Sequence, residues 1–319
     1  MVLLIVISLF IMLGVLIYQD FIEEPLLIIQ EPEIREPVTI MFVGDIMLSR
    51  GVDYYMEEND DYKYPFLKIK NYLENAELLI GNLEGPISDK GYNVGSIYSF
   101  RHKPESVEGL TYAGFDILNL ANNHIMDYTR EAMEQTFEIL EQNNIEYIGT
   151  GEDYSSAHQP KIKTLSNGLN VAFLGYTSFG SELWEATNEQ SGVARIKKEE
   201  IENDIILAKA MADIVVVNFH FGEEYETRSN LEQQDLAHFS IDSGVDLVIG
   251  HHPHVVQEIE FYKGKYIAYS LGNFVFDQDF SEETMGGIIL EVDLDEIGII
   301  NIREVETEIT NEFQVLIKE

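Results

Sequence analysis

One pattern recurs along the chain and limits the folds that it can adopt. An apolar run short enough for a buried strand is followed by a polar or glycine-containing loop, and then by a stretch with apolar residues at helical spacing. Strands that are apolar throughout are typical of sheets covered on both faces. The pattern therefore predicts an α/β fold. The expected strands are residues 38–43, 78–80, 115–120, 145–148, 171–174, 214–217, 245–249 and 266–271.

The stretches between and after these strands complete the outline of one domain. The tail at residues 287–317 alternates apolar and polar side chains, which predicts terminal strands with one solvated face. No internal repeat divides the chain, so residues 38–319 are expected to form a single domain. The expected helices are residues 104–113, 130–142, 198–211 and 231–243.

Side chains with metal-binding chemistry follow several of the expected strands. Loops at the carboxyl ends of strands converge in open α/β sheets, so residues that are far apart in sequence can form one site there. The chain has no cysteine, so a metal site must use nitrogen and oxygen ligands. Carboxylates, an amide oxygen and imidazoles together suit a pair of divalent cations. The residues in these loops are Asp45, Glu84, Asn123, His124, His220, His251, His252 and His254.

The loop from Gly250 to His254 concentrates three of these histidines. If the segment is extended, His252 and His254 point to the same side, and Pro253 restricts the backbone between them. By the same alternation, His251 is expected to face elsewhere. The loop therefore predicts His252 and His254 as ligands, with a polar turn carrying incidental histidines as the alternative.

The order of these residues resembles that of the calcineurin-like metallophosphoesterase superfamily. Several motifs, in order, more closely resemble the bacterial capsule-synthesis protein family CapA/PgsA, which is associated with poly-γ-glutamate synthesis. The resemblance runs from about residue 38 to residue 276. The motifs are GDIML at residues 44–48, NLEGP at 82–86, ANNH at 121–124, HPHVVQ at 252–257 and YSLGNF at 269–274.

The resemblance implies a two-sheet sandwich flanked by helices (αββα), with the site at the strand ends. It implies two divalent metal ions of the Mn, Fe or Zn type, and it implies that His124 protonates the leaving oxygen or steadies the transition state. Met47 stands where the superfamily has a histidine, and a thioether is a poor ligand for hard cations, so one metal is expected to be held weakly. The metal ligands implied are Asp45, Glu84, Asn123, His220, His252 and His254.

Four further loop residues are candidates for supporting roles. Arg101 is a candidate for gripping an anionic substrate, because an arginine fork binds carboxylate or phosphate with two hydrogen bonds. A surface ion pair is the equally weighted alternative. Asp127, Glu224 and Asn273 are candidates for orienting the metal ligands.

The charge of the chain excludes one class of partner. It has 57 acidic and 20 basic residues, for a formal net charge of −37. Such a surface repels phosphate backbones, so nucleic-acid binding is not expected. The same charge opposes long-range attraction of a polyanion such as poly-γ-glutamate. Chemistry on one chain end is therefore easier to reconcile with this sequence than binding along the polymer.

The amino terminus predicts attachment to a membrane. The segment from Val2 to Tyr18 is apolar apart from Ser8, which is near the lower length limit for a membrane-spanning helix. No small-x-small cleavage site follows it, so residues 1–18 are expected to be an uncleaved, single-pass signal anchor, with a cleaved signal peptide as the alternative. Residues 19–37 read as an extended acidic tether with prolines. The domain at 38–319 is then expected outside the cytoplasm, at the cell membrane.

These observations lead to one expected function with two alternatives. The expectation is a membrane-anchored, extracytoplasmic metal-dependent hydrolase or transferase that participates in capsule or poly-γ-glutamate synthesis or export, together with other synthesis subunits. One alternative is a non-catalytic metal-binding component of a synthesis complex, which Met47 favours. The other is a general phosphoesterase unrelated to capsule. His124 beside Asn123 favours catalysis, because a structural metal site has no need of a proton donor.

Overall fold

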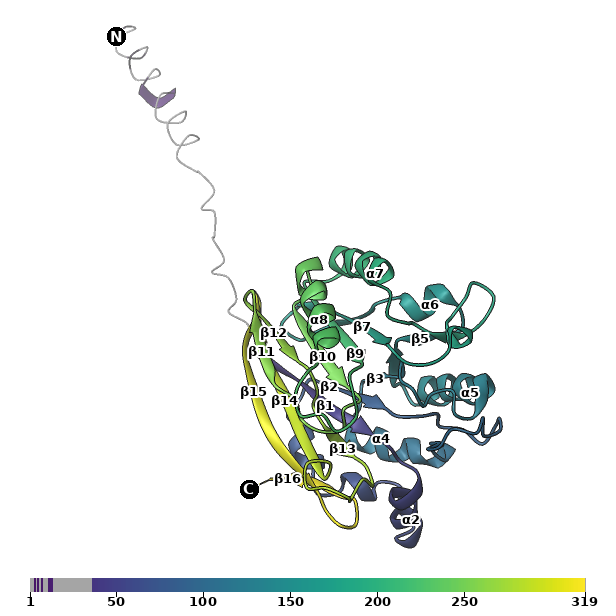
Figure 1. The fold of residues 1–319 in the computed structure, drawn as a ribbon. Helices are drawn as coiled ribbons and strands as arrows, with labels where there is room; N and C mark the ends of the chain where they lie inside the picture. Colours follow the sequence, from purple (N-terminus) through teal and green to yellow (C-terminus); the bar gives the residue numbers. More distant parts are fainter. Residues whose placement is uncertain (1–2, 4, 6, 8–10, 14–35, 319) are drawn as a thin grey trace. The chain divides into compact units, whose positions relative to one another are not determined.

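The computed structural model describes residues 3, 5, 7, 11–13 and 36–318 (Figure 1). By its internal contacts the chain divides into residues 1–35 and 36–319. Within the described residues, no helix is long and apolar enough to cross a membrane. The anchor predicted at residues 1–18 lies largely outside the described residues, as does most of the tether, and both stay predictions.

Residues 36–318 contain two large sheets. The first has eight strands in the order β16-β15-β14-β1-β2-β3-β4, with β13 paired to β1. Its strands are β1 (Val38–Ile46), β2 (Leu78–Leu83), β3 (Ile117–Asn119), β4 (Glu146–Ile148), β13 (Asn273–Val275), β14 (Gly286–Asp295), β15 (Gly298–Ile309) and β16 (Val315–Ile317).

The second sheet has six strands in the order β11-β12-β10-β9-β7-β6, and a short pair, β5 with β8, stands apart. The six strands are β6 (Lys161–Thr164), β7 (Asn170–Thr177), β9 (Ile214–His220), β10 (Leu247–His251), β11 (Ile259–Tyr262) and β12 (Lys265–Ala268). The short pair is β5 (Thr150–Gly151) and β8 (Gly192–Val193).

Parallel pairing aligns the strand ends that matter for function. Strands β1 to β4 run parallel in the first sheet, and β7, β9, β10 and β12 run parallel in the second. Within each sheet the carboxyl ends of these strands therefore lie at one edge. The terminal strands β14 to β16 extend the first sheet in antiparallel fashion, as the alternating tail predicted.

The two sheets pack face to face through apolar side chains. One buried cluster combines Ile40 and Phe42 of the first sheet with Phe173, Val216 and Ile249 of the second. The rings of Phe42 and Phe173 lie 6.4 Å apart. This packing covers the inner face of each sheet, and helices cover the outer faces, so the near-continuous apolar sequence of the central strands follows from the layering.

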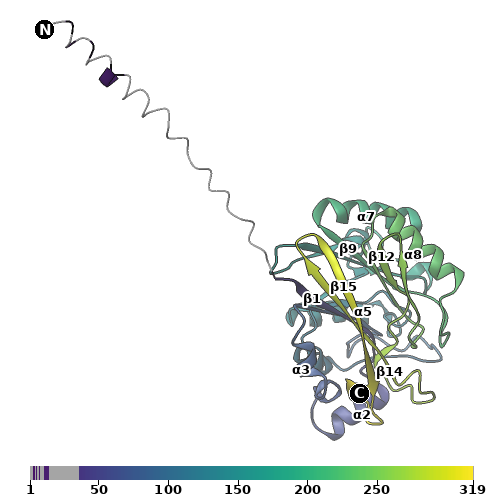
Figure 2. The ribbon, with the colours of Figure 1, turned by 90° about the vertical axis from the view of Figure 1, so that its left-hand side faces the viewer.

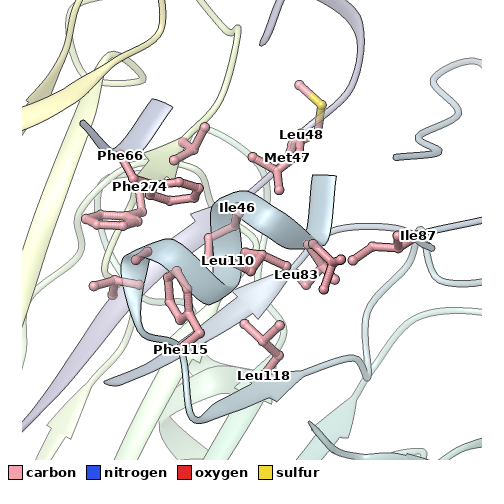
Figure 3. Packing of buried hydrophobic residues seen from close by; sticks show 14 of the residues in the cluster. Ile46, Met47, Leu48, Phe66, Leu83, Ile87, Leu110, Phe115, Leu118 and Phe274 are labelled. Atoms are coloured by element: carbon pink, nitrogen blue, oxygen red, sulfur yellow. The ribbon is translucent and has the colours of Figure 1, made fainter. Parts of the chain in front are cut away.

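Helices cover the outer faces. Helix α7 (Lys198–Met211) and helix α8 (Leu231–Ser243) pack on the second sheet, as Figure 2 also shows. Over the first sheet, Leu110 of α4 (Val107–Ala113) lies against Ile46, Leu83 and Leu118 (Figure 3). Within residues 36–318, the other α-helices are α2 (Arg50–Glu58), α3 (Lys70–Leu73), α5 (Thr129–Gln142) and α6 (Tyr154–His158), and short 3-10 turns occupy Tyr64–Phe66, Pro104–Ser106 and Glu182–Trp184.

The predicted α/β fold with flanking helices is confirmed, and helices α7 and α8 have the predicted bounds. Strand β10 begins at Leu247 and not at residue 245. The reason is the end of α8, where Gly244 has a φ of 112° and Val245 still donates its backbone N–H to Ser240. The strand then continues to His251, which pairs with His220 of β9.

Candidate metal centre

The candidate centre lies where the carboxyl ends of β1, β2, β9 and β10 meet. Asp45 stands near the end of β1, opposite Asn82 of the neighbouring β2. Glu84 directly follows β2, and His220 ends β9 beside His251 of β10. The strand-end positions predicted from the sequence are therefore brought together from both sheets.

Asp45 is the most heavily contacted carboxylate of the centre. Its Oδ1 accepts from Asn82 Nδ2 at 2.8 Å, and its Oδ2 accepts from the backbone N–H of His252 at 3.2 Å. The Nδ1 atoms of His254 and His251 lie 3.2 and 3.5 Å from its oxygens. Burial acts to raise the pKa of Asp45, but the contacts with His251 and His254 outweigh it and hold that pKa well below its usual range. Asp45 is therefore an ionised carboxylate.

Glu84 lacks such support. It is fully buried, with its oxygens 3.5 Å from His220 Nε2 and 3.8 Å from His124 Nε2. Its Oε2 has no hydrogen-bond partner among the described residues. Burial, and then the charge of Asp45, raise the pKa of Glu84 well above its usual range. A buried carboxyl with an unpaired oxygen lacks the positive charge that would compensate its ionised form.

Three buried imidazoles of the centre, those of His220, His251 and His252, have nitrogens without a hydrogen-bond partner among the described residues. In the described part of the chain, no group bonds Nδ1 of His220 or Nδ1 of His252. Burial, followed by the charge of His252, lowers the pKa of His220 well below its usual range. Burial, followed by the charge of His254, lowers the pKa of His252 to about 3. Both rings are therefore neutral and keep a free lone pair, which is the form that ligates metals.

The potential ligand atoms gather into two overlapping groups. Asp45, Glu84 and His254 form one, and Glu224, His252 and His254 form the other; within each group the atoms lie within 4.8 Å of one another. His254 belongs to both. The unpaired atoms of Glu84, His220 and His252 and this donor set fit divalent cations.

Asn273 fixes which nitrogen of His254 is free. The Oδ1 of Asn273 lies 3.0 Å from His254 Nδ1, while its Nδ2 donates to Gln278 Oε1 and to the carbonyl of Thr284. Because the amide orientation is set by those two acceptors, Oδ1 must accept from Nδ1–H. When His254 gives up its second proton, Nε2 is therefore the nitrogen that it would offer to a metal, and Asn273 orients the ring.

His124 and Asp127 form a hydrogen-bonded pair at the edge of the centre. The Nδ1 of His124 lies 2.7 Å from Asp127 Oδ2, and its Nε2 is directed toward Glu84. Asp127 is held in turn by the backbone N–H of Phe100 at 2.8 Å and by Ser96 Oγ at 3.2 Å. The carboxylate thereby sets the ring orientation and leaves Nε2 for proton transfer.

Asn123 and Asn122, which are adjacent in sequence, have different roles. Asn123 Oδ1 lies 2.8 Å from His220 Nε2, so Asn123 reaches the centre. Asn122 donates to the carbonyl of Leu83 at 2.7 Å and accepts from the backbone of His124 at 3.1 Å. Asn122 therefore shapes the turn that carries its two neighbours.

The expectation that His251 faces away is wrong. Its ring is buried and its Nδ1 lies 3.5 Å from Asp45. Alternation fails because residues 252–254 are not extended: His252 has a φ of 100° and His254 a φ of 60°. Three histidines of one loop therefore approach the same centre.

Met47 stands at the position where the superfamily has a ligand histidine, and His102 contacts the next residue, Leu48. Met47 is fully buried among apolar side chains (Figure 3), and its Sδ accepts from the backbone N–H and Oγ of Ser49. His102 accepts from the backbone of Leu48 at 3.1 Å and lies 2.9 Å from the carbonyl of Glu84. Both its nitrogens are thus used in joining two strand-end loops, and burial lowers its pKa to about 4. His102 supports the centre without being available as a ligand.

A cleft of about 400 Å³ opens beside the centre. Arg101 is not among its lining residues: its guanidinium lies over the ring of Tyr128 at 4.2 Å, and its predicted role in substrate binding stays a prediction. Sequence reasoning missed Asn82, although it stands two residues before Glu84 and so on the same side of a strand. It also missed Arg50 and Tyr225. The cleft is lined by Arg50, Ser96, Ile97, Tyr98, Phe100, Asn123, His124, Asp127, Glu224, Tyr225, His254, Asp277, Gln278 and Phe280.

Comparison with known proteins identifies the family. Residues 39–278 match the model of the family described as bacterial capsule synthesis protein PGA_cap. The chain belongs to this family. Among its relatives, the capsule biosynthesis protein CapA of Bacillus anthracis is 35% identical over 261 residues, covering 77% of this chain and 62% of the relative. The PGA biosynthesis protein CapA of Bacillus subtilis is 36% identical over 247 residues, covering 75% of this chain and 63% of the relative.

Two further proteins are similar to this chain. A probable polyglutamine synthesis accessory protein of Mycobacterium tuberculosis is 27% identical over 285 residues, covering 76% of this chain and 75% of that protein. A crystal structure of a Thermus thermophilus protein superposes with a TM-score of 0.43 at 11% identity, covering 84% of this chain and 99% of that one. The matched part spans less than two thirds of the length of the two Bacillus relatives.

Proposed function

We propose that this protein is a metal-dependent hydrolase or transferase of the metallophosphoesterase type that acts in capsule or poly-γ-glutamate synthesis. The family, and relatives named for capsule and poly-glutamate biosynthesis, support the biological setting. The observation that carries the chemistry is the His124–Asp127 pair, directed at Glu84 beside two overlapping groups of metal-binding side chains.

The residues that would hold the metals are those with compatible donors. Asp45, Glu84 and His254 form one group and Glu224, His252 and His254 the other, with His220 and Asn123 adjacent. A pair of divalent cations supplies an activated water and neutralises charge on a reacting phosphoryl or acyl group. Ionised Asp45 and neutral His252 are already in the protonation states that ligation needs.

Residues of the chain itself would orient the group that transfers a proton to the leaving oxygen. Asp127 holds His124 by Nδ1, so that Nε2 is the nitrogen through which a proton would pass to a leaving oxygen. The ring of Phe100 lies 4.0 Å from that of His124, and the ring of Phe179 lies 4.0 Å from that of His252, which shields both imidazoles from water. Typical general-acid catalysis contributes roughly 10²–10⁴-fold to a rate.

The setting that we propose is the outer side of the cell membrane. The apolar segment of residues 2–18 would anchor the chain, residues 19–37 would act as a tether, and other subunits of the synthesis machinery would be its partners. The net charge of −37 favours action on a chain end over binding along a polyanion. Membrane fractionation with protease protection tests this setting, and recovery of the full chain in the cytosol would contradict it.

A non-catalytic metal-binding component is the second candidate, and the buried Met47 in place of a histidine favours it. One experiment separates the two. The full chain is analysed for bound metal and assayed on a phosphodiester and on γ-linked glutamate, beside His124→Asn. Bound metal with turnover that depends on His124 supports the enzyme. Bound metal without turnover supports the second candidate, and a chain that takes up no metal contradicts both.

A further inference from the structure

A single strong cation stands in the wall of the cleft. Arg50 begins helix α2 and lines the cleft together with the carboxyl side chains of Asp127, Glu224 and Asp277 and with the imidazoles of His124 and His254. Among the lining residues that the structure describes, it is the sole arginine or lysine. The carboxyl groups of this lining oppose the entry of an anion, and Arg50 supplies a permanent positive charge that attracts one.

Contacts on two sides fix the guanidinium. Its Nε donates to Asp277 Oδ2 at 3.1 Å, and its Nη2 donates to Asp277 Oδ1. Its central carbon lies 4.9 Å from the centre of the Phe100 ring, which is itself 4.0 Å from the ring of His124. Arg50 is therefore held one aromatic ring away from the proposed proton donor.

This arrangement leaves donors free. Asp277 uses one edge of the guanidinium, and within residues 36–318 no group accepts from Nη1. The side chain remains about one-third exposed, at 36%. A planar fork that is oriented by one carboxylate, with its other edge open to a cleft, is suited to binding a second oxyanion.

The backbone of Arg50 supports a special role for this position. Its φ is 54°, in the left-handed region that non-glycine residues rarely adopt. Such a conformation costs on the order of 1–3 kcal/mol and is concentrated at functional sites. The adjacent Gly51 donates its backbone N–H to the same Asp277 at 2.9 Å, so the strained turn and the guanidinium share one anchor.

We propose that Arg50 binds an oxyanion of the substrate, either a carboxylate or a phosphate group, and so determines which substrates the cleft accepts. The inference rests on the proposed function, because it takes the cleft as the substrate site. The aromatic side chains of Tyr98, Tyr225 and Phe280 line the same cleft and would pack against the uncharged part of the substrate.

A purely structural role makes a different prediction. If Arg50 serves to anchor Asp277, then Asp277→Asn and Arg50→Gln should weaken ligand binding alike, because each breaks the same pair. If Arg50 binds the anion directly, the two variants should diverge. Removing the charge of Asp277 takes away a competitor for the guanidinium and a source of repulsion, while the asparagine can still accept from Gly51.

The test is calorimetric titration of the full chain after chelator treatment, with inorganic phosphate and with γ-glutamylglutamate as probes. Arg50→Gln should weaken binding of at least one probe about tenfold or more, as expected for loss of a charge-assisted pair. Arg50→Lys should retain part of the affinity, and Asp277→Asn should bind as tightly as the unmodified chain or more tightly. The matched control is Arg303→Gln, which removes an arginine that also pairs with an aspartate, Asp293, but lies outside the cleft, and it should change neither affinity.

The probe whose affinity falls in Arg50→Gln shows whether the oxyanion is a phosphate or a carboxylate. Equal affinity in Arg50→Gln and the unmodified chain would overturn the proposal, as would the absence of binding by both probes. Equal weakening by Asp277→Asn and Arg50→Gln would overturn it in favour of the anchor. Because binding is measured without metal or turnover, a chain that binds through Arg50 but lacks activity would contradict the proposed function alone.

Discussion

Two histidines of this protein have nearly the same immediate partners and different surroundings. His124 Nδ1 lies 2.7 Å from Asp127, and its Nε2 lies 3.8 Å from Glu84. His158 Nδ1 lies 2.7 Å from Asp204, and its Nε2 lies 3.7 Å from Glu200. A histidine between two carboxylates is therefore insufficient to define a site in this chain.

The surroundings separate the two clusters. His124 lines a cleft beside further metal-binding side chains, among them Glu224 and His254. His158 lies under Tyr154, whose ring is stacked on it at 4.3 Å, and Tyr176 donates to the same Asp204 oxygen at 2.8 Å. Access from the cleft and neighbouring metal-binding side chains suit the first cluster, around His124, to chemistry. The second cluster, around His158, is packed between α6 and α7 and has a structural role.

The largest expected effect is on turnover. His124→Asn should lower kcat by roughly 10²–10⁴-fold, because it removes the proton donor. His158→Gln should leave kcat within about twofold while lowering the free energy of unfolding by about 1–3 kcal/mol, because it leaves Asp204 without that partner. Steady-state kinetics and denaturant unfolding of both variants check this. A similar loss of kcat in the two would remove the distinction between the clusters.

The next largest effect is on metal binding. Loss of the carboxylate of Glu84, in the first cluster, should weaken it, whereas loss of the carboxylate of Glu200, in the second cluster, should not. Glu84→Gln should weaken metal binding by more than about 100-fold, the upper end for outer-shell partners. The metal-free variant should nevertheless be more stable than the metal-free parent near neutral pH. The reason is that the raised pKa of Glu84 makes its ionised form costly when folded. Metal titration and thermal unfolding measure the two effects, with Glu200→Gln as the control that should keep metal affinity.

The metal-free centre should show a pH-dependent stability. Burial acts to lower the pKa of His254, but the hydrogen bond to Asp45 outweighs it and raises that pKa to about 9. A raised histidine pKa gives stability that is complete below the unfolded value of about 6.5 and is lost as pH rises through the folded value. The chelated protein should thus lose stability between pH of about 6.5 and about 9. Asp45→Asn should flatten this slope in denaturant unfolding across that range, whereas an unchanged slope would assign it to other groups.

The smallest expected effect concerns a hydroxyl of the structural cluster. Tyr176→Phe removes the hydrogen bond to Asp204 and should cost about 1 kcal/mol of unfolding free energy, with kcat and metal content unchanged. Thermal unfolding with an activity assay checks it. A fall in activity would show that the second cluster communicates with the first.

Sequence reasoning predicted the layers and the strand-end loops because both depend on local patterns. Apolar runs identified β1, β2, β7 and β9, and polar residues after them identified Asp45, Glu84 and His220. It failed for His251, because alternation assumes an extended chain and the positive φ values of His252 and His254 break it. It also gave no sign of Arg50 as a cleft residue, since its neighbours there come from segments up to about 230 residues away.

By itself, the sequence determined the chemistry that this protein has available. It supplies nitrogen and oxygen ligands without thiolates, places them after apolar strands and surrounds them with an acidic surface. The tertiary structure decided which of these groups act together. Pairing of β9 with β10 brought His220 beside His251, and packing of the two sheets brought both to Asp45 and Glu84. It also enclosed His158 and left His124 beside a cleft, because burial and convergence depend on contacts between distant segments that no local pattern specifies.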